Sequence, residues 1–296
     1  MVYTNFKLNN MQKKYKNMVL IVILMAFNTV HAGSRQLGTG AVTQIEGSSG
    51  SGLVPWATIA GYGEESEADF NLAYTYLSTD DYDFDMKAVS YGWNNRLEVS
   101  FAQQELDLNT LGPALGLPNA SLKQDVIGLK LRLAGNIVYT KMPQIAIGLQ
   151  HKKNKDFFIP SVAGAVDDSG TDIYLSASKL FLSKPAGLNG FLTMTLRSSN
   201  ANETGLLGFG GDIRQGRSIL AETSLGVFLN KSTVIGMDFR QKKSNLSFAS
   251  EDHWRDIFIA YVPNRHVSFV LAYADLGNIA TLDNQQGLYF SVTGSF

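Results

Sequence analysis

The 296-residue sequence has no cysteine and, after its first 32 residues, no long apolar run. The missing cysteine excludes a disulfide framework, thiolate metal sites and a cysteine nucleophile. A membrane-spanning helix needs an apolar stretch of at least about 18 residues, so helical spans are excluded beyond this N-terminal region. Histidine is also scarce, with four in the whole chain.

Basic residues are too few and too scattered for a nucleic-acid surface. The chain has 25 Lys and Arg against 26 Asp and Glu. Without residues 1–32, which hold four Lys and no acidic residue, 21 basic and 26 acidic residues remain, a net charge of −5. Nucleic-acid binding needs a basic face, so we expect no nucleic-acid partner.

The N-terminal region has the features of a secretory signal peptide. Four Lys precede a ten-residue apolar run, and the small residue Ala32 follows it. This run is shorter than the about 20 residues that span a bilayer, and a basic start with a short apolar centre is typical of a cleaved signal. We predict a signal peptide at residues 1–32 and one mature domain at residues 33–296. Met1 and Met11 both remain open as the start, because the segment from Met11 is already a complete signal.

From about residue 37 onwards, segments of alternating polarity are separated by turns. In residues 127–133, Ile and Leu alternate with Gly, Lys and Arg. A period of two indicates strands with one apolar and one polar face, and segments of about ten residues match tilted strands that cross a bilayer. A soluble sandwich also alternates, but its strands are shorter, about five or six residues. The last strand ends on Phe296, as closing strands of outer-membrane barrels do, so we predict an all-β, transmembrane antiparallel β-barrel.

Short and long connections alternate along this pattern, as periplasmic turns and extracellular loops do. The short ones are residues 93–95, 135–142, 183–190, 230–232 and 263–266. The long ones are residues 107–123, 153–170, 200–216, 242–253 and 277–285. With residues 37–46 and 53–62 as the first two strands, the expected total is 14. Twelve strands remain possible if this first pair forms a plug or a periplasmic segment.

If the apolar positions face lipid, the charged positions of the strands face the lumen, because Arg or Lys at the bilayer midplane costs about 2–4 kcal/mol. The candidate pore-lining residues are Asp85, Lys87, Glu98, Lys130, Arg132, Arg197, Glu222, Asp238 and Arg240. They can form a salt-bridged filling or line a water-filled pore, and a barrel wider than eight strands favours the pore. Trp93 and Trp254 are expected in aromatic girdles at the two rims.

We expect no catalytic residue, no cofactor and no metal site. His151, His253 and His266 lie in separate segments, although a hydrolase would need a His–Ser pair at one rim. Acidic clusters such as Asp80–Asp85 are better explained by turns and solvation than by cation binding. The glycine-rich residues 208–211 lack the Lys of a phosphate loop and can instead fold inward to narrow the lumen.

Several motifs occur in order along the chain. They are TQIEG at residues 43–47, GLVPWA at 52–57, PQIAIGLQ at 143–150, DDSGTD at 167–172 and LGFGGD at 207–212. This set resembles a Gram-negative family catalogued as domain of unknown function 3034 and grouped with outer-membrane β-barrel proteins. The resemblance covers about residues 40–296, with Gly50-Ser51-Gly52 where three glycines are expected. It implies the fold and an outer-membrane location, but no activity and no site residues.

The sequence thus predicts an outer-membrane pore for passive diffusion of small solutes. The alternative is a closed structural or docking barrel, which would bind a partner or lipopolysaccharide through residues 107–123 and 153–170. A membrane hydrolase is the least favoured function. Expected partners are outer-membrane lipid, lipopolysaccharide and the barrel assembly machinery, the last through the strand that ends in Phe296.

Overall fold

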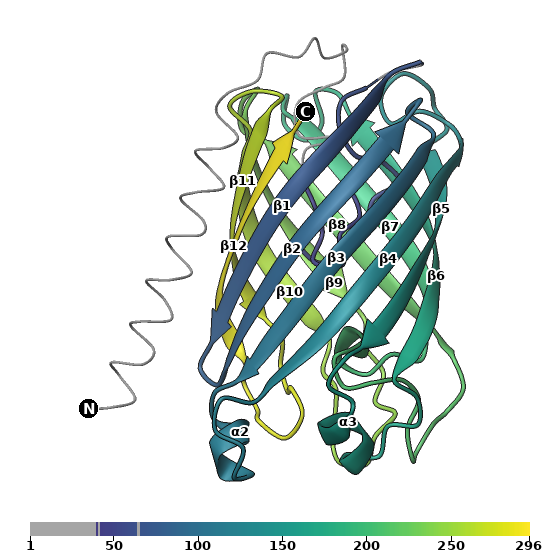
Figure 1. Ribbon diagram of the computed structural model, residues 1–296. Coiled ribbons are helices and arrows are strands. Elements are labelled where there is room, and N and C mark those ends of the chain that lie inside the picture. The colour runs from purple at the N-terminus through teal and green to yellow at the C-terminus, as the bar shows by residue number, and fades with distance from the viewer. Residues whose placement is uncertain (1–39, 41, 64–65) are drawn as a thin grey trace.

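The computed structural model describes residues 40, 42–63 and 66–296, and its dominant feature is one closed antiparallel barrel of twelve strands (Figure 1). The predicted signal peptide lies outside the described residues. The strands are β1 Ala68–Thr79, β2 Tyr82–Trp93, β3 Leu97–Leu108, β4 Ser121–Ala134, β5 Gln144–Asn154, β6 Ser169–Phe181, β7 Asn189–Ser199, β8 Ser218–Phe228, β9 Thr233–Arg240, β10 Trp254–Tyr261, β11 Val267–Asp275 and β12 Gln286–Ser295. The predicted all-β barrel is therefore confirmed.

The barrel closes where the last strand meets the first. β12 pairs with β1 from Asn71↔Ser295 to Thr79↔Gly287. Phe70 and Phe296 extend this seam, because each donates its backbone N–H to the other's carbonyl at 3.0 and 2.9 Å, and their rings stack 5.0 Å apart. Closure leaves no strand with an unpaired edge.

The two ends of the barrel differ (Figure 1). The turn end carries the short connections and the start of β1, and the loop end carries the long connections. The loop end also holds the short helices α2 (Leu111–Ala114), α3 (Phe158–Val162) and η1 (Glu203–Gly205). No helix among the described residues is long and apolar enough to cross a membrane. The predicted alternation holds, except that a two-residue turn joins β1 to β2 at the loop end.

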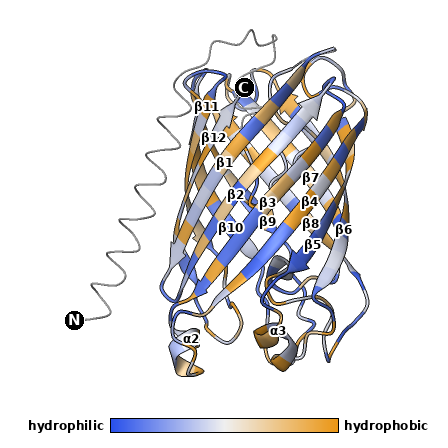
Figure 2. Ribbon diagram, viewed as in Figure 1, coloured by the Kyte–Doolittle hydropathy of each residue, from blue (hydrophilic) through white to orange (hydrophobic). Residues whose placement is uncertain are grey.

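The strands expose apolar side chains on the outside of the barrel. In β4, Ile127, Leu129 and Leu131 are exposed, whereas Gly128 and Lys130 between them are buried. The same alternation of hydropathy runs along the other strands (Figure 2). Fractional exposures in this outer row include 37% at Phe101 and 60% at Met194 and Ile257. The period of two therefore sorts apolar residues outward and polar residues inward, the reverse of a soluble protein.

Residues 42–63 form no strand of the barrel, and every one of them is buried. We call this segment the plug; Figure 1 shows it in purple within the barrel. The expectation that residues 37–46 and 53–62 form two further strands is therefore wrong, and the alternative of twelve strands with a plug is correct. Residues before 40 in the first of these ranges lie outside the described residues.

The plug has a local reason for not joining the sheet. Its centre, residues 47–52, is Gly-Ser-Ser-Gly-Ser-Gly, and Gly47 has a φ of +91°, which a strand does not accept. Pro55 lacks the N–H that a ladder needs. The segment instead makes two isolated bridges to itself, Thr43↔Ser49 and Gly50↔Pro55.

Candidate functional site

The plug is held by polar side chains that point inward from the barrel wall. Ser178 on β6 accepts a hydrogen bond from the Ala57 N–H at 2.9 Å, and Gln144 on β5 donates to the Ala57 carbonyl at 2.6 Å. Asp238 on β9 accepts the Leu53 N–H at 3.0 Å. Wall side chains thus satisfy the backbone of a segment that has no sheet of its own, as buried polar groups require.

The ion pair between Glu98 on β3 and Lys130 on β4 binds the plug at a second place. Lys130 donates to the carbonyls of Ser49 and Thr58 at 2.8 and 2.9 Å. Glu98 accepts the backbone N–H groups of Ser49 and Ala60 at 3.1 and 2.8 Å. Lys130 and Glu98 also lie 3.2 Å apart. This one buried ion pair therefore binds the plug at residues 49, 58 and 60.

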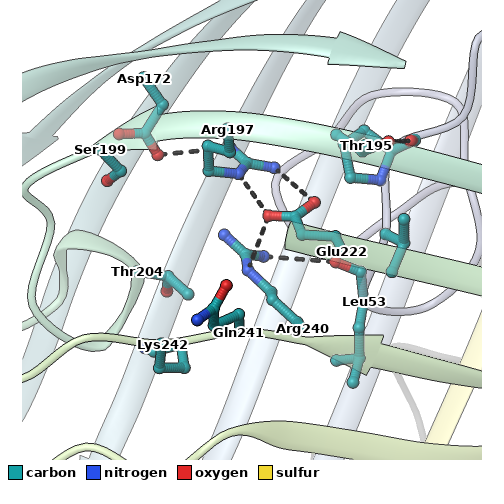
Figure 3. Close-up of polar contacts among 12 residues, drawn as sticks. Leu53, Asp172, Thr195, Arg197, Ser199, Thr204, Glu222, Arg240, Gln241 and Lys242 are labelled. Atoms are coloured by element: carbon teal, nitrogen blue, oxygen red, sulfur yellow. Dashed lines mark hydrogen bonds and ion pairs between the residues drawn. The ribbon is translucent and has the colours of Figure 1, made fainter. Parts of the chain in front are cut away.

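The plug carries one carboxylate into a cluster of wall cations. Glu46 Oε1 and Oε2 accept hydrogen bonds from Arg240 at 2.9 and 3.1 Å, and Glu46 Oε2 lies 3.2 Å from Arg197 NH2. Lys152 also donates to Glu46 Oε1. We call Lys152, Arg197 and Arg240 the basic triad; Figure 3 shows its two arginines. All four side chains are nearly or fully buried.

Two wall carboxylates share these cations (Figure 3). Asp172 lies 2.7 Å from Lys152 and 3.3 Å from Arg197. Glu222 lies 2.5 Å from Arg197 and 3.4 Å from Arg240. Within this cluster, three positive charges against two negative charges leave one positive charge, and the carboxylate of the plug neutralises it. A buried charge without a partner is strongly destabilising, so this balance favours the plugged state.

A glycine makes room for the support of Arg197. The guanidinium carbon of Arg197 lies 5.2 Å from the ring centroid of Tyr174, a cation–π distance. The Tyr174 ring in turn lies over Gly148 on the neighbouring strand, where an added Cβ would come within 2.1 Å of it. Gly148 therefore leaves room for the Tyr174 ring beside the cation.

A loop between β7 and β8 covers the plug from the loop end. Residues 202–211, which we call the inward loop, are all buried. Lys152 donates to the Thr204 carbonyl at 3.0 Å, and Asn154 donates to the Leu206 carbonyl at 2.6 Å. Residues 208–211, expected to fold inward, do so as part of this loop. The triad is thus enclosed by the plug and by the inward loop.

The inward loop is fastened to the next long loop through a buried ionic group. Lys242 lies 3.2 Å from Glu203 and 2.6 Å from Glu251, and the Lys242 ammonium is 4.3 Å from the centroid of the Trp254 ring. Burial, together with the nearby Glu251 charge, raises the pKa of Glu203 to about 8, although Lys242 opposes the shift. Tyr82 lines the same small cavity as Glu203, and its hydroxyl donates to the Ile279 carbonyl at 3.1 Å.

This titration predicts a pH-dependent inward loop. In the docked loop the pKa of Glu203 is about 8, whereas in a released loop it would have its ordinary value of 4.5. Docking is therefore most stable at low pH and weakens by up to about tenfold per pH unit until pH reaches that upper value. We expect hydrogen exchange in residues 202–209, corrected for intrinsic rates, to be faster at pH 8 than at pH 6. Glu203→Gln should remove the difference, and equal protection at both pH values in the unmodified protein would contradict the assignment.

The structure brings six of the nine candidate pore residues into the interior. These are Glu98, Lys130, Arg197, Glu222, Asp238 and Arg240. Instead of facing an open channel, they contact the plug or one another. Arg132 lies on the inward side at the turn end, where it donates to the carbonyls of Asn95 and Gly135 at 3.4 and 2.8 Å. Arg132 thereby links the turn between β2 and β3 to the connection between β4 and β5.

Asp85 and Lys87 are the two errors in this set. Both lie on the outer face of β2, in the same row as the exposed Val89. The inward row of β2 contains Phe84 and Met86, both buried. This row is apolar because it faces an apolar part of the plug, so hydropathy alone assigns the two faces of β2 the wrong way round.

The aromatic girdle prediction holds at one rim. Trp93 is 51% exposed on the outer face at the turn end. Trp254 was expected at the outer rim, but it points inward and is buried, with its ring 5.9 Å from the guanidinium carbon of Arg240. It is part of the interior site.

Three residues of the site were missed by the sequence reasoning: Glu46, Lys152 and Asp172. Glu46 was assigned to the end of a strand. Lys152 stands next to Lys153 in a polar strand end, and Asp172 lies near the start of β6. The inward orientation of Lys152 could have been found by extending the inward row of β5 from Gly148 through Gln150 to Lys152. No sequence signal places Glu46 beside residues that lie more than 100 positions away.

Two apolar cavities lead from the loop end toward the triad. The outer one, of about 210 Å³, is lined by apolar residues of α2, α3 and neighbouring loops, among them Leu111 and Phe158. The inner one, of about 40 Å³, is lined in part by Leu53 of the plug. The two share Tyr82, Leu106 and Ile279 in their walls and are therefore adjacent; we call the two cavities together the apolar passage.

The three histidines considered for catalysis have separate partners. His151 Nδ1 is 2.9 Å from Thr171 Oγ1 on the barrel exterior. His253 packs edge-on against Phe239, with ring centroids 5.6 Å apart. His266 lies in a turn, 3.2 Å from the Ser295 carbonyl oxygen.

A family model described as "Protein of unknown function (DUF3034)" matches residues 39–293. Among solved structures, the chain is similar to the KdgM porin, free and in complex with disordered oligogalacturonate. Both comparisons have a TM-score of 0.50 and 10% identity and cover 76% of this chain and 99% of the porin. The Acinetobacter baumannii protein Omp33 gives a TM-score of 0.44 and 10% identity, with 78% and 99% covered. At such identities the likeness shows the fold alone. No curated protein matches the chain.

Proposed function

The chain belongs to the family described as Protein of unknown function (DUF3034), and from this premise we propose that it is a pore of the Gram-negative outer membrane, closed in this structure by its own N-terminal segment. The proposed cargo is a small solute that diffuses passively, and the proposed role is not enzymatic. The turn end would face the periplasm, and the loop end would face the medium.

A membrane location is supported by the outer surface of the barrel. Exposed side chains such as Ile127, Met194 and Ile257 lie in one apolar belt, and Trp93 lies where an aromatic girdle is expected. A soluble protein rarely exposes so continuous an apolar area. A closed barrel also leaves no backbone group of its strands unpaired in hydrocarbon. The seam at Phe296 is where we expect the assembly machinery to recognise the chain.

The observation that carries the pore proposal is the kind of contact between plug and wall. The wall holds the plug through many hydrogen bonds and ion pairs, such as those of Lys130, Ser178 and Glu46, beside apolar contacts such as that of Trp56 with Phe191, whose ring centroids lie 4.6 Å apart. Water can replace the polar bonds when the segment leaves, whereas the apolar contacts oppose its release. The same polar wall would then line a hydrated channel. Twelve strands enclose more space than the eight that side chains alone can fill.

A closed docking barrel is the second candidate, and one observation favours it. The short helices at the loop end expose Phe158 and Val162 at 73% and 75% and Leu115 at 51%. Exposed apolar residues of this kind on loops often mark a contact with a partner. In this alternative the plug is a permanent filling, and the loops bind a partner protein or lipopolysaccharide.

Bilayer recordings separate these two functions. Protein purified in folded form, verified by faster electrophoretic migration before heating than after it, is reconstituted in planar bilayers. We expect discrete conductance steps as the plug leaves and returns, with long closed intervals. Folded protein that stays silent over a wide voltage range, together with unchanged solute uptake in proteoliposomes, would reject the pore and favour docking.

A further inference from the structure

The ligand of the basic triad in this structure is a carboxylate that belongs to the plug and not to the wall. Glu46 receives two hydrogen bonds from Arg240 at 2.9 and 3.1 Å and a contact from Arg197 at 3.2 Å. A bidentate arginine contact with added cations is the arrangement that proteins use to bind carboxylates. If the plug leaves, these donors lose their acceptor.

The charges of the wall define what can replace Glu46. Asp172 and Glu222 remain beside the three cations, so the emptied site carries one positive charge. A ligand with one negative charge restores neutrality, whereas a doubly charged anion would leave an excess beside two fixed carboxylates. Because unpaired buried charge is costly, the site favours a monoanion.

The apolar passage leads to this site. Thr204 of the inward loop and Trp254 of β10, neither of which belongs to the plug, line its inner cavity, and each also contacts the triad. The carbonyl of Thr204 accepts from Lys152 at 3.0 Å, and the Trp254 ring lies 5.9 Å from Arg240. An apolar group in the inner cavity would thus lie next to the carboxylate position.

The outer cavity is large enough for the body of a small apolar ligand. Its volume is about 210 Å³, and a dry apolar cavity of about 150 Å³ is known to bind benzene. The outer cavity is lined almost entirely by apolar residues, so a sugar would leave its hydroxyl groups without hydrogen-bond partners there. A hydrocarbon chain or a phenyl ring has no such loss.

We propose that the basic triad, with the apolar passage, is a binding site for small amphipathic monocarboxylic acids, and that Glu46 occupies the carboxylate position while the barrel is closed. This deepens the proposed function, on which it rests, by naming the solute class. The incoming acid competes with Glu46 for the same donors, so its binding favours release of the plug.

The test measures binding directly, with full-length protein in lipid nanodiscs and isothermal titration calorimetry. The probe is 4-phenylbutyrate, and the two comparison ligands are its neutral amide and acetate. We expect the acid to bind at least about tenfold more tightly than the amide, because charge-assisted bonds are lost, and more tightly than acetate, which lacks the apolar body. Equal affinity for acid and amide would overturn the proposal.

Two variants should act in opposite directions. Glu46→Gln removes the internal competitor and should tighten 4-phenylbutyrate binding by about tenfold or more, whereas Arg240→Gln should weaken it by at least as much. Glu105→Gln serves as the matched control and should leave binding unchanged. Glu105 lies on the outer surface, where it forms a half-exposed ion pair with Lys123 at 3.4 Å. If Arg240→Gln does not fold, Glu46→Gln alone decides, since unchanged or weaker binding in that variant contradicts competition.

These outcomes can be told apart from failure of the pore itself. Calorimetric binding needs no conduction, so acid binding with electrically silent bilayers would reject the pore and keep the binding site. Discrete conductance without acid binding in either the unmodified protein or Glu46→Gln would keep the pore and reject the binding site.

Discussion

Oxidation of an Ala57→Cys, Ser178→Cys double variant is expected to abolish channel openings, and a reductant such as dithiothreitol should restore them. The Ala57 N–H lies 2.9 Å from Ser178 Oγ, so the two positions face each other across the boundary between plug and wall. A disulfide there would tie the plug to β6 and prevent its release. Because the chain has no native cysteine, this disulfide would be the only one in the variant. Planar bilayer current before and after reduction provides the measurement.

The controls are the two single-cysteine variants, which should open in the same way under oxidising and reducing conditions. Peptide mass spectrometry establishes how much of the double variant is cross-linked. If fully cross-linked protein conducts as well as the reduced form, current passes without movement of the plug, and the gating role of residues 42–63 is wrong.

A second large effect is expected from Glu46→Gln. The substitution keeps the shape of the side chain but removes the charge that faces Lys152, Arg197 and Arg240. The cluster then holds three cations and two carboxylates, and its surplus charge is buried as long as the plug stays in place. Charge-assisted hydrogen bonds contribute about 1.5–3 kcal/mol each, so the fraction of time open should rise about tenfold or more. Reversal potentials in a salt gradient should be the same in this variant and in the unmodified protein, because Glu46 leaves the lumen with the plug.

Glu105→Gln is again the matched control, because it changes the net charge equally but lies on the outer surface. It should leave both open fraction and ion preference unaltered. An unchanged open fraction in Glu46→Gln would mean that the ionic contacts of the plug do not hold it in the lumen.

The strands were predictable because each leaves a local record in the sequence. Residues 127–133 alternate cleanly, since the outer face of β4 is apolar and the inner face carries Lys130. The plug was harder to recognise. Residues 53–62 contain enough apolar residues to resemble a strand, and their failure to join the sheet depends on the glycine-rich residues 47–52 and on Pro55. Turn chemistry overrode apolar content there.

The candidate site was only partly predictable, because its contacts are long-range. Glu46 and Arg240 are 194 positions apart, and no local pattern links them. Face assignment also failed where the interior is apolar, as for Asp85 and Lys87 on β2 and for Trp254 on β10. On β2 the inward side chains meet an apolar part of the interior, so the usual rule that polar residues of a barrel face inward does not apply. On β10 the Trp254 ring lies inward beside the cations Arg240 and Lys242 instead of at the lipid interface.

The position of the plug in the chain bears on how the molecule is built. The segment immediately precedes β1, so in the proposed export to the outer membrane it would enter the cell envelope before any strand does. Its bonds reach β3, β6 and β9 through Glu98, Ser178 and Asp238, strands that are distant from one another in sequence. By binding to separate strands, the plug gives an incomplete, still open sheet an interior segment to close around. The seam between β1 and β12 can then close last, over an interior that is already filled.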